Sequence, residues 1–234
     1  MKFNIITIFP DIFNSYFSES IIKRAQKNKI INIKTHDLRK WTNDKHKTVD
    51  DTPCGGGAGM VMKIEPLHKA LNSLRLKVPA LPAGKKSHPP AGKAGKSKII
   101  LLSAKGKTWN QQLAKKYSKL DEVILICGRY EGVDERITNF IDEEISIGDY
   151  VLTGGEIPAM IIVDSITRLL PGVLGNEASA KDESHSKPGV LEYPQYTKPE
   201  IFKAGNKKYK VPEVLMSGHH KKMEEWREKN RKNK

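Results

Sequence analysis

The sequence predicts an α/β protein in which helices cover both faces of a mainly parallel sheet. Short apolar runs alternate with longer amphipathic segments along residues 1–170, which is the rhythm of strand–helix–strand units. Glycine-bearing loops stand beside several of these runs, as expected where parallel strands end near a ligand. The chain has 234 residues, enough for one large domain or two small ones with a substantial core.

The expected strands are short apolar runs, and the expected helices carry apolar residues at helical spacing. In residues 15–28, Ile21 and Ala25 share one face. Residues 65–75 place Pro66 in the first turn, where a missing N–H does no harm. We expect strands at 2–8, 30–35, 98–103, 122–127 and 143–148, and helices at 15–28, 65–75, 108–118, 133–140 and 156–170.

The pattern changes after Gly172. Residues 171–199 contain four prolines and few apolar runs, which predicts a linker or an interface loop. The chain then becomes basic and reaches a helical segment at 219–231. The predicted organisation is a main domain over 1–171, a linker over 172–198, and a small, mostly helical, basic domain over 199–234.

Residues 79–97 are rich in Pro, Gly, Ala and Lys, which predicts a flexible surface insertion. Its sequence AGKAGKS resembles the end of a Walker A phosphate loop. The motif needs a glycine where Pro90 stands, and no strand precedes it. A Walker-type nucleotide site is therefore excluded.

The charge distribution indicates a polyanionic partner and, separately, a ligand without phosphate. The formal net charge is +14 and the pI about 9.6, which favours nucleic acid as partner. Residues 199–234 carry eleven Lys/Arg against five Glu. Residues 121–156, which include Gly154 and Gly155, carry ten Asp/Glu against two Arg. A neutral or cationic small ligand suits that acidic stretch better than a polyphosphate.

The composition disfavours a disulfide-linked protein, a metalloprotein and a membrane protein. Cys54 and Cys127 are expected to be two reduced thiols, and no His or Cys spacing predicts a metal cage. No apolar run approaches the roughly 18 residues of a membrane span. The N-terminus lacks the features of a signal peptide, so we expect the protein in the cytoplasm.

Three glycine-bearing loops are candidates for a binding site, at 54–60, 127–132 and 153–156. None fits the GxGxxG dinucleotide fingerprint. Taken alone, each is best explained as a tight turn. The second and third leave successive strands of the same predicted sheet, which favours a shared ligand pocket.

Two further candidates lie beyond these loops. Arg168 follows an apolar helical segment, where an arginine either caps the helix or reaches an anion or a base edge. Residues 182–185, with sequence DESH, lie in the proline-rich connector. A carboxylate there is a candidate general base, although the pattern alone favours an exposed turn.

Five segments together closely resemble the bacterial tRNA (guanine-N1)-methyltransferases, in the same order and over nearly the whole chain. They are DKHKTVDDTPCGGGAGMVM (44–62), ICGRYEGVDERI (126–137), ISIGDYVLTGGEIPAM (145–160), RLLPGVLGNEAS (168–179) and VPEVLMSGHH (211–220).

The resemblance implies a SPOUT fold with a C-terminal trefoil knot in the main domain. It implies a homodimer with active sites at the subunit interface, and transfer of the methyl group of S-adenosylmethionine to N1 of guanosine 37 in the anticodon stem-loop of tRNAs with G at position 36. The implied cofactor contacts are Leu101, Gly128, Tyr130, Glu131, Ser146, Ile147, Gly148, Tyr150, Leu152, Gly154, Gly155 and Pro158.

The resemblance also implies catalytic residues. The family base is an Asp of the connector, and Glu183 stands at that position here, with Asp182 beside it. Arg168 matches an Arg that holds the target guanine. Mg²⁺ supports the reaction in this family. The first cofactor loop departs from the family pattern. The resemblance implies that residues 199–234 form a tRNA-binding domain, and this domain is expected to be truncated, without the family helices that often follow the segment around Trp226. Two alternatives stay open: an RNA-binding SPOUT protein with little or no catalysis, and a methyltransferase for another RNA nucleotide.

Overall fold

The computed structural model describes residues 1–75, 96–175 and 183–233, and it divides the chain into two compact units. Unit 1 spans Met1–Gly175 and unit 2 spans Asn176–Lys234. The expected insertion at 79–97 lies almost entirely outside the described residues. No helix within the described ranges is long and apolar enough to cross a membrane.

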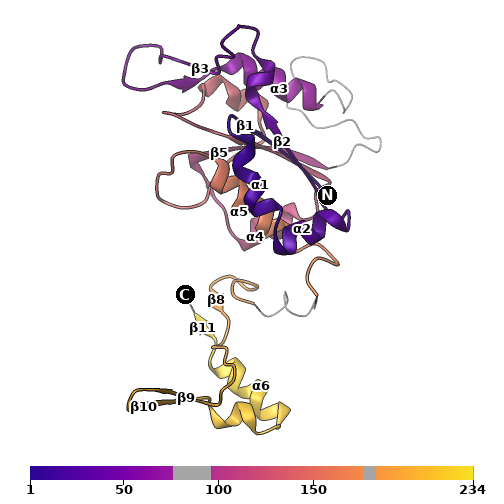
Figure 1. The fold of residues 1–234 in the computed structure, drawn as a ribbon, viewed down its shortest axis with the longest axis vertical. Coiled ribbons are helices and arrows are strands. Elements are labelled where there is room, and N and C mark those ends of the chain that lie inside the picture. The colour runs from indigo at the N-terminus through magenta and orange to yellow at the C-terminus, as the bar shows by residue number, and fades with distance from the viewer. Residues whose placement is uncertain (76–95, 176–182, 234) are drawn as a thin grey trace. The chain divides into compact units, whose positions relative to one another are not determined.

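Unit 1 is built on a five-stranded parallel sheet (Figure 1). Its order is β2-β1-β6-β5-β7, and every neighbouring pair runs parallel. The expected α/β fold is thereby confirmed. The strands are β1 (Lys2–Thr7), β2 (Asn32–Asp37), β5 (Ser97–Thr108), β6 (Glu122–Cys127) and β7 (Glu143–Ser146).

Helices and short strand pairs fill the connections of unit 1. The α-helices are α1 (Asn14–Phe17), α2 (Ser20–Lys27), α3 (Ile64–Arg75), α4 (Gln111–Tyr117) and α5 (Glu156–Thr167). The 3₁₀ helices are η1 (Pro10–Phe13), η2 (Leu38–Trp41) and η3 (Glu135–Phe140), and the pair β3 (Asp50–Asp51) with β4 (Val61–Met62) is antiparallel.

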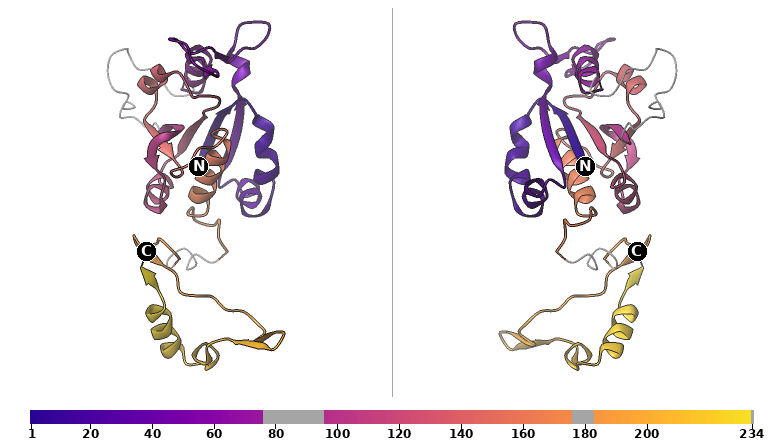
Figure 2. Two further views of the ribbon diagram at one scale, coloured as in Figure 1. Left: turned by 90° about the vertical axis from the view of Figure 1, so that its left-hand side faces the viewer. Right: turned by 90° about the vertical axis from the view of Figure 1, so that its right-hand side faces the viewer.

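Each face of the sheet has its own apolar core. Phe3 and Leu125 pack with Ile162 of α5 on one face. Ile6 packs with Leu67 of α3 on the other. Because side chains of a strand alternate between faces, burial on both explains the near-continuous apolar runs of β1 and β6. On the first face, α5 lies between the N-terminal helices and α4 (Figure 2).

Three elements differ from the sequence expectation. The helix expected at 15–28 is divided into α1 and α2. The helix expected at 133–140 is the 3₁₀ helix η3, because Val133 is still extended and bridges Met62, and Asp134 then caps Arg136 N. The strand expected at 98–103 continues to Thr108, because the chain leaves the ladder after Leu102 and pairs with β7 again from Lys107.

Unit 2 contains α6 (His220–Lys229) together with two short strand pairs. The expected helical segment at its C-terminal end is present, whereas the strand pairs had no counterpart in the expectation. The hairpin joins β9 (Ile201–Ala204) to β10 (Lys207–Lys210), β8 (Val190–Leu191) pairs with β11 (Lys232–Asn233), and a 3₁₀ helix, η5, spans Glu213–Met216.

Candidate active site

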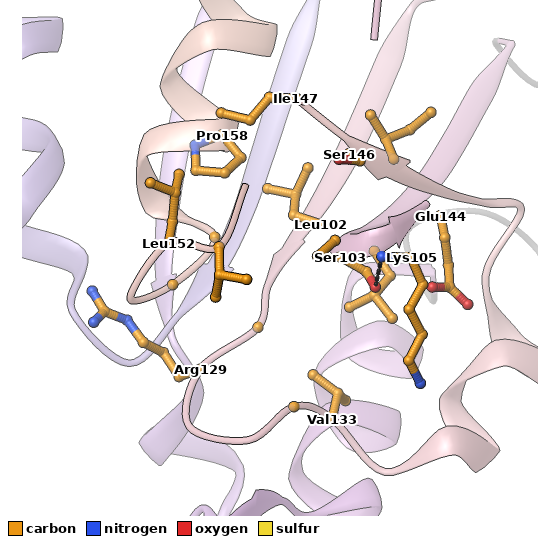
Figure 3. Close-up of a pocket in the computed structure, with 18 of the residues that line it drawn as sticks. Leu102, Ser103, Lys105, Arg129, Val133, Glu144, Ser146, Ile147, Leu152 and Pro158 are labelled. Atoms are coloured by element: carbon orange, nitrogen blue, oxygen red, sulfur yellow. Dashed lines mark hydrogen bonds between the residues drawn. The ribbon is translucent and has the colours of Figure 1, made fainter. Parts of the chain in front are cut away.

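A cavity of about 270 Å³ lies at the carboxyl ends of three neighbouring parallel strands, β6, β5 and β7 (Figure 3). Ligands of open parallel sheets sit at this edge. Leu102, Leu152 and Pro158 approach the cavity from three different elements. The lining comes from residues 101–105, 128–133, 144–148 and 150–155, with Glu135 and Pro158.

All twelve residues implied as cofactor contacts line this one cavity. They come from three stretches that are up to 57 residues apart in the chain, between Leu101 and Pro158. Parallel strands explain the convergence, because their carboxyl ends meet at one edge of the sheet. Their role as ligand contacts stays a prediction.

A buried ion pair ties the second loop to the third. Arg129 Nε donates to Glu156 Oε2 at 2.9 Å, and Arg129 Nη1 donates to the Thr153 carbonyl at 3.1 Å. The Glu156 side chain is 1% exposed, and its second oxygen accepts from Thr7 Oγ1 at 2.7 Å. The Arg129 guanidinium also lies 4.7 Å from the Phe9 ring centroid. Both carboxylate oxygens are therefore bonded, as a buried charge requires.

The Arg129–Glu156 pair was not predicted from the sequence. Arg129 lies inside a glycine-rich turn, and Glu156 begins an apolar helix, where an acidic residue is common. Their opposite charges, on two loops expected to be neighbours, are the signal that could have linked them.

Gly154 and Gly155 pack against the protein itself. A Cβ on Gly155 would stand 2.7 Å from Cys127 Cα and 3.0 Å from Gly128 N. At Gly154 a Cβ would collide with the side chain of Arg129. The Gly155 N–H donates to the Gly128 carbonyl at 2.9 Å. The two glycines therefore allow the third loop to close onto the second.

The third loop is held by its own hydrogen bonds. Ser146 Oγ donates to the Gly148 carbonyl at 2.9 Å and accepts from Gly148 N at 3.2 Å. Tyr150 OH donates to the Ile147 carbonyl at 3.4 Å. The loop therefore has a defined shape around the cavity, with Tyr150, Val151 and Leu152 exposed on it.

The second loop is joined to the glycine-rich loop that precedes β4. Glu131 N donates to the Met60 carbonyl at 3.0 Å, and a Cβ on Gly59 would collide with the Glu131 side chain. Tyr130 has a left-handed backbone, with φ of 60°. Burial and the nearby Asp50 carboxylate raise the pKa of the Tyr130 phenol, so its hydroxyl remains a donor at neutral pH.

Charges around the cavity do not form a phosphate site. Its lining contains three carboxylates and two cations. Lys105 forms a salt bridge with Glu135 at 3.7 Å, and Arg129 is committed to Glu156. Both cations are thus already paired. A ligand with a positive centre suits this surface better than a polyphosphate.

No cluster of three or more His, Cys, Asp or Glu side chains that could hold a metal ion occurs among the described residues. The residues described here therefore do not fit a protein-only cage for the Mg²⁺ that the resemblance implies. No step of the reaction is assigned to a metal.

The predicted catalytic residues lie outside the cavity lining. Arg168 is the C-cap residue of α5, half-buried, and its N–H donates to the Asp164 carbonyl at 3.1 Å. Glu183 belongs to unit 2, where its carbonyl accepts from Ser186 N at 3.0 Å in a turn. Asp182 lies outside the described residues. The roles of all three stay predictions.

Fold and cavity together define an α/β protein with a small-molecule site at the carboxyl ends of its parallel strands. A family model described as tRNA (Guanine-1)-methyltransferase TrmD matches residues 1–234. The chain therefore belongs to the tRNA (guanine-N1)-methyltransferase family.

Individual relatives agree with this assignment. The chain is 50% identical over 228 residues to the tRNA (guanine-N(1)-)-methyltransferase of Ruminiclostridium cellulolyticum, covering 97% of this chain and 89% of the relative. It is 50% identical over 229 residues to the protein of the same name from Dictyoglomus turgidum, covering 98% and 84%. The crystal structure of tRNA (m1G37) methyltransferase from Aquifex aeolicus superposes with a TM-score of 0.73 at 37% identity, over 97% of this chain and 87% of that chain.

Proposed function

We propose that this protein transfers the methyl group of S-adenosylmethionine to N1 of guanosine 37 in tRNAs that carry G at position 36. The observation that carries the proposal is the convergence of all twelve implied cofactor contacts on one cavity, in a chain that belongs to this family. The acidic surroundings of the cavity favour a phosphate-free cation, which describes the sulfonium of S-adenosylmethionine.

Methyl transfer to guanine N1 requires two contributions from the protein. S-adenosylmethionine supplies an activated methyl group when bound. Guanine N1 carries a proton, and a positioned base that removes it contributes about 10²–10⁴-fold. The rest of the acceleration comes from holding the two substrates in line. We assign the base to Glu183, with Asp182 as the neighbouring alternative, and the positioning of the guanine to Arg168.

The resemblance implies a homodimer with active sites at the subunit interface, and we include this dimer in the proposal. The surface of α5 supports it. Ile157 and Ile161 are exposed at i, i+4 spacing, while Pro158 and Ile162, which directly follow them in the same helix, are buried. A helix that is apolar on all sides is normally covered on all sides. Val151, on the loop before it, is 88% exposed. A second copy of the chain would cover this surface, and we place the dimeric enzyme in the cytoplasm with its tRNA substrate.

The test is methyl transfer from labelled S-adenosylmethionine to two tRNAs, one with G36-G37 and one with A36-G37. We expect transfer to the first and little to the second. Equal transfer to both would contradict the stated specificity. Tight tRNA binding with no transfer to either would favour an RNA-binding protein without catalysis, and a methyl group on another nucleotide would favour a different target.

A further inference from the structure

The hairpin of β9 and β10 is the part of unit 2 whose construction the proposed reaction leaves unexplained. Its strands pair in register from Ile201 with Lys210 to Ala204 with Lys207. Gly205, with φ of 58°, takes the first central position of the two-residue turn, as in type II′ hairpins. The ladder continues outward, since Val211 N donates to the Glu200 carbonyl at 2.9 Å. The hairpin extends away from α6 in both sets of views (Figures 1 and 2).

Every residue of both strands is exposed, although two of them are aromatic. Phe202 and Tyr209 are direct cross-strand partners, with ring centroids 6.3 Å apart. They are 58% and 55% exposed. The two rings are therefore neighbours on one face of the hairpin, and both are exposed to solvent.

The same hairpin carries four lysines and no carboxylate, at positions 203, 207, 208 and 210. None of the four forms a salt bridge with any other described residue. Lys203 and Lys208 lie directly opposite each other across the ladder. Like charges in that position destabilise a strand pair, so this arrangement is unfavourable until an anion approaches.

A purely structural role explains the aromatic pair of the hairpin but not its lysines. A cross-strand aromatic pair stabilises a hairpin, which is marginal on its own in water. Opposed lysines do the reverse. Aromatic rings that stack on bases, flanked by cations that reach phosphates, are the combination by which proteins bind unpaired RNA.

We propose that the β9–β10 hairpin is a tRNA-binding ribbon: its lysines neutralise phosphates, and the Phe202–Tyr209 pair stacks on an unpaired base. The identity of the RNA rests on the proposed function. Because side chains of a strand alternate between faces, Lys207 lies on the same face as the two rings, while Lys203, Lys208 and Lys210 lie on the other face. Their long, flexible stems allow these lysines to reach phosphates that pass along the edges of the ribbon.

Two variants separate the two kinds of contact. Replacing all four hairpin lysines by Gln removes charge, and the matched control replaces Lys23, Lys27, Lys29 and Lys34, exposed on unit 1, in the same way. A second variant, Phe202→Ile with Tyr209→Val, removes the rings but keeps residues that favour strands. The measurement is tRNA affinity without S-adenosylmethionine, at several salt concentrations, with thermal unfolding to verify the fold.

The lysine variant should bind tRNA more weakly, and its slope of log K against log salt should become shallower by about 3, since each lost phosphate contact removes about 0.7–0.9. The control should keep the wild-type slope. The aromatic variant should bind at least about fivefold more weakly with an unchanged slope.

An unchanged slope in the lysine variant would overturn the proposal, as would equal changes in variant and control. Loss of the fold in one variant leaves the other as the test. Because tRNA binding is measured without turnover, the result of this test does not depend on whether the protein transfers a methyl group. If the protein binds tRNA through the hairpin but transfers no methyl group, the proposed methyltransferase activity is refuted and the proposed role of the hairpin stands.

Discussion

The cavity of unit 1 and the hairpin of unit 2 are built on opposite principles. The cavity is lined by loops that contain five glycines, its two cations are already paired, and most of its lining comes from the acidic part of the chain. The hairpin presents side chains on an exposed two-stranded ladder, with four lysines and two rings. The first suits one small molecule of defined shape, and the second suits a long anion of variable path.

This difference predicts how each region responds to mutation. A cavity shaped by close backbone approach should fail when a single atom is added. A ribbon of independent cations should fail gradually, one phosphate contact at a time. The proposed catalytic base, Glu183, belongs to neither region, so its substitution is the strongest test of the comparison.

The largest effect is expected for Glu183→Ala. Loss of the base should lower turnover by about 10²–10⁴-fold, while S-adenosylmethionine and tRNA bind as in the wild type, because neither binding region is touched. Single-turnover kinetics and separate binding titrations measure this. If Asp182→Ala has this effect and Glu183→Ala does not, the base is the neighbouring residue.

Next in size is Glu156→Ala, which removes the partner of a largely buried guanidinium. Breaking a buried pair costs about 3–5 kcal/mol of the free energy of unfolding. Urea denaturation measures it. Glu224→Ala is the matched control, since Glu224 pairs with Arg227 at 3.3 Å on an exposed helix face and should change stability by at most about 0.5 kcal/mol. Equal costs at both sites would refute the structural role of the Glu156 pair.

A smaller effect is expected for Gly155→Ala. The added methyl meets the Cys127 backbone and must push the third loop away from the second. We expect about tenfold weaker binding of S-adenosylmethionine, equivalent to about 1.4 kcal/mol, with unchanged tRNA affinity. Calorimetric titration measures both. Gly175→Ala is the control, because a Cβ there meets nothing within 4 Å. Wild-type cofactor affinity in Gly155→Ala would show that loop closure does not shape the site.

The smallest change concerns the two thiols. Cys127 is fully buried and Cys54 exposed. Burial raises the pKa of the Cys127 thiol, so it stays protonated in the folded protein, and stability should decline as the pH rises above the about 8.5 of a free thiol. Mass spectrometry after iodoacetamide treatment at pH 8 should find Cys54 alkylated and Cys127 protected. Equal alkylation in the native protein would contradict the tight packing beneath Gly155.

Much of unit 1 could be predicted from the sequence because its strands are buried on both faces. The runs NIITI and VILIC predict β1 and β6 directly. The loops that follow the strands expected at 122–127 and 143–148 were predicted to be neighbours, and a bridge between Arg129 and Gly154 confirms this. The return of β5 at 103–108 was missed, since that stretch is polar and pairs only through its backbone with β7.

Long-range contacts explain what else escaped prediction. The Arg129–Glu156 pair joins residues 27 positions apart, and no local pattern specifies which charges will meet. The hairpin lies in a stretch of lysines, where strand propensity is weak and the turn glycine is the main signal. A trefoil knot, implied by the resemblance, leaves no periodic trace in a sequence at all.

The most direct test of the central claim is a crystal structure of the protein with S-adenosylmethionine. We expect the ligand to lie at the carboxyl ends of β5, β6 and β7, against the backbone of the loops that contain Gly128, Gly148 and Leu152. A bound ligand found elsewhere on the chain, with this cavity empty, would contradict it.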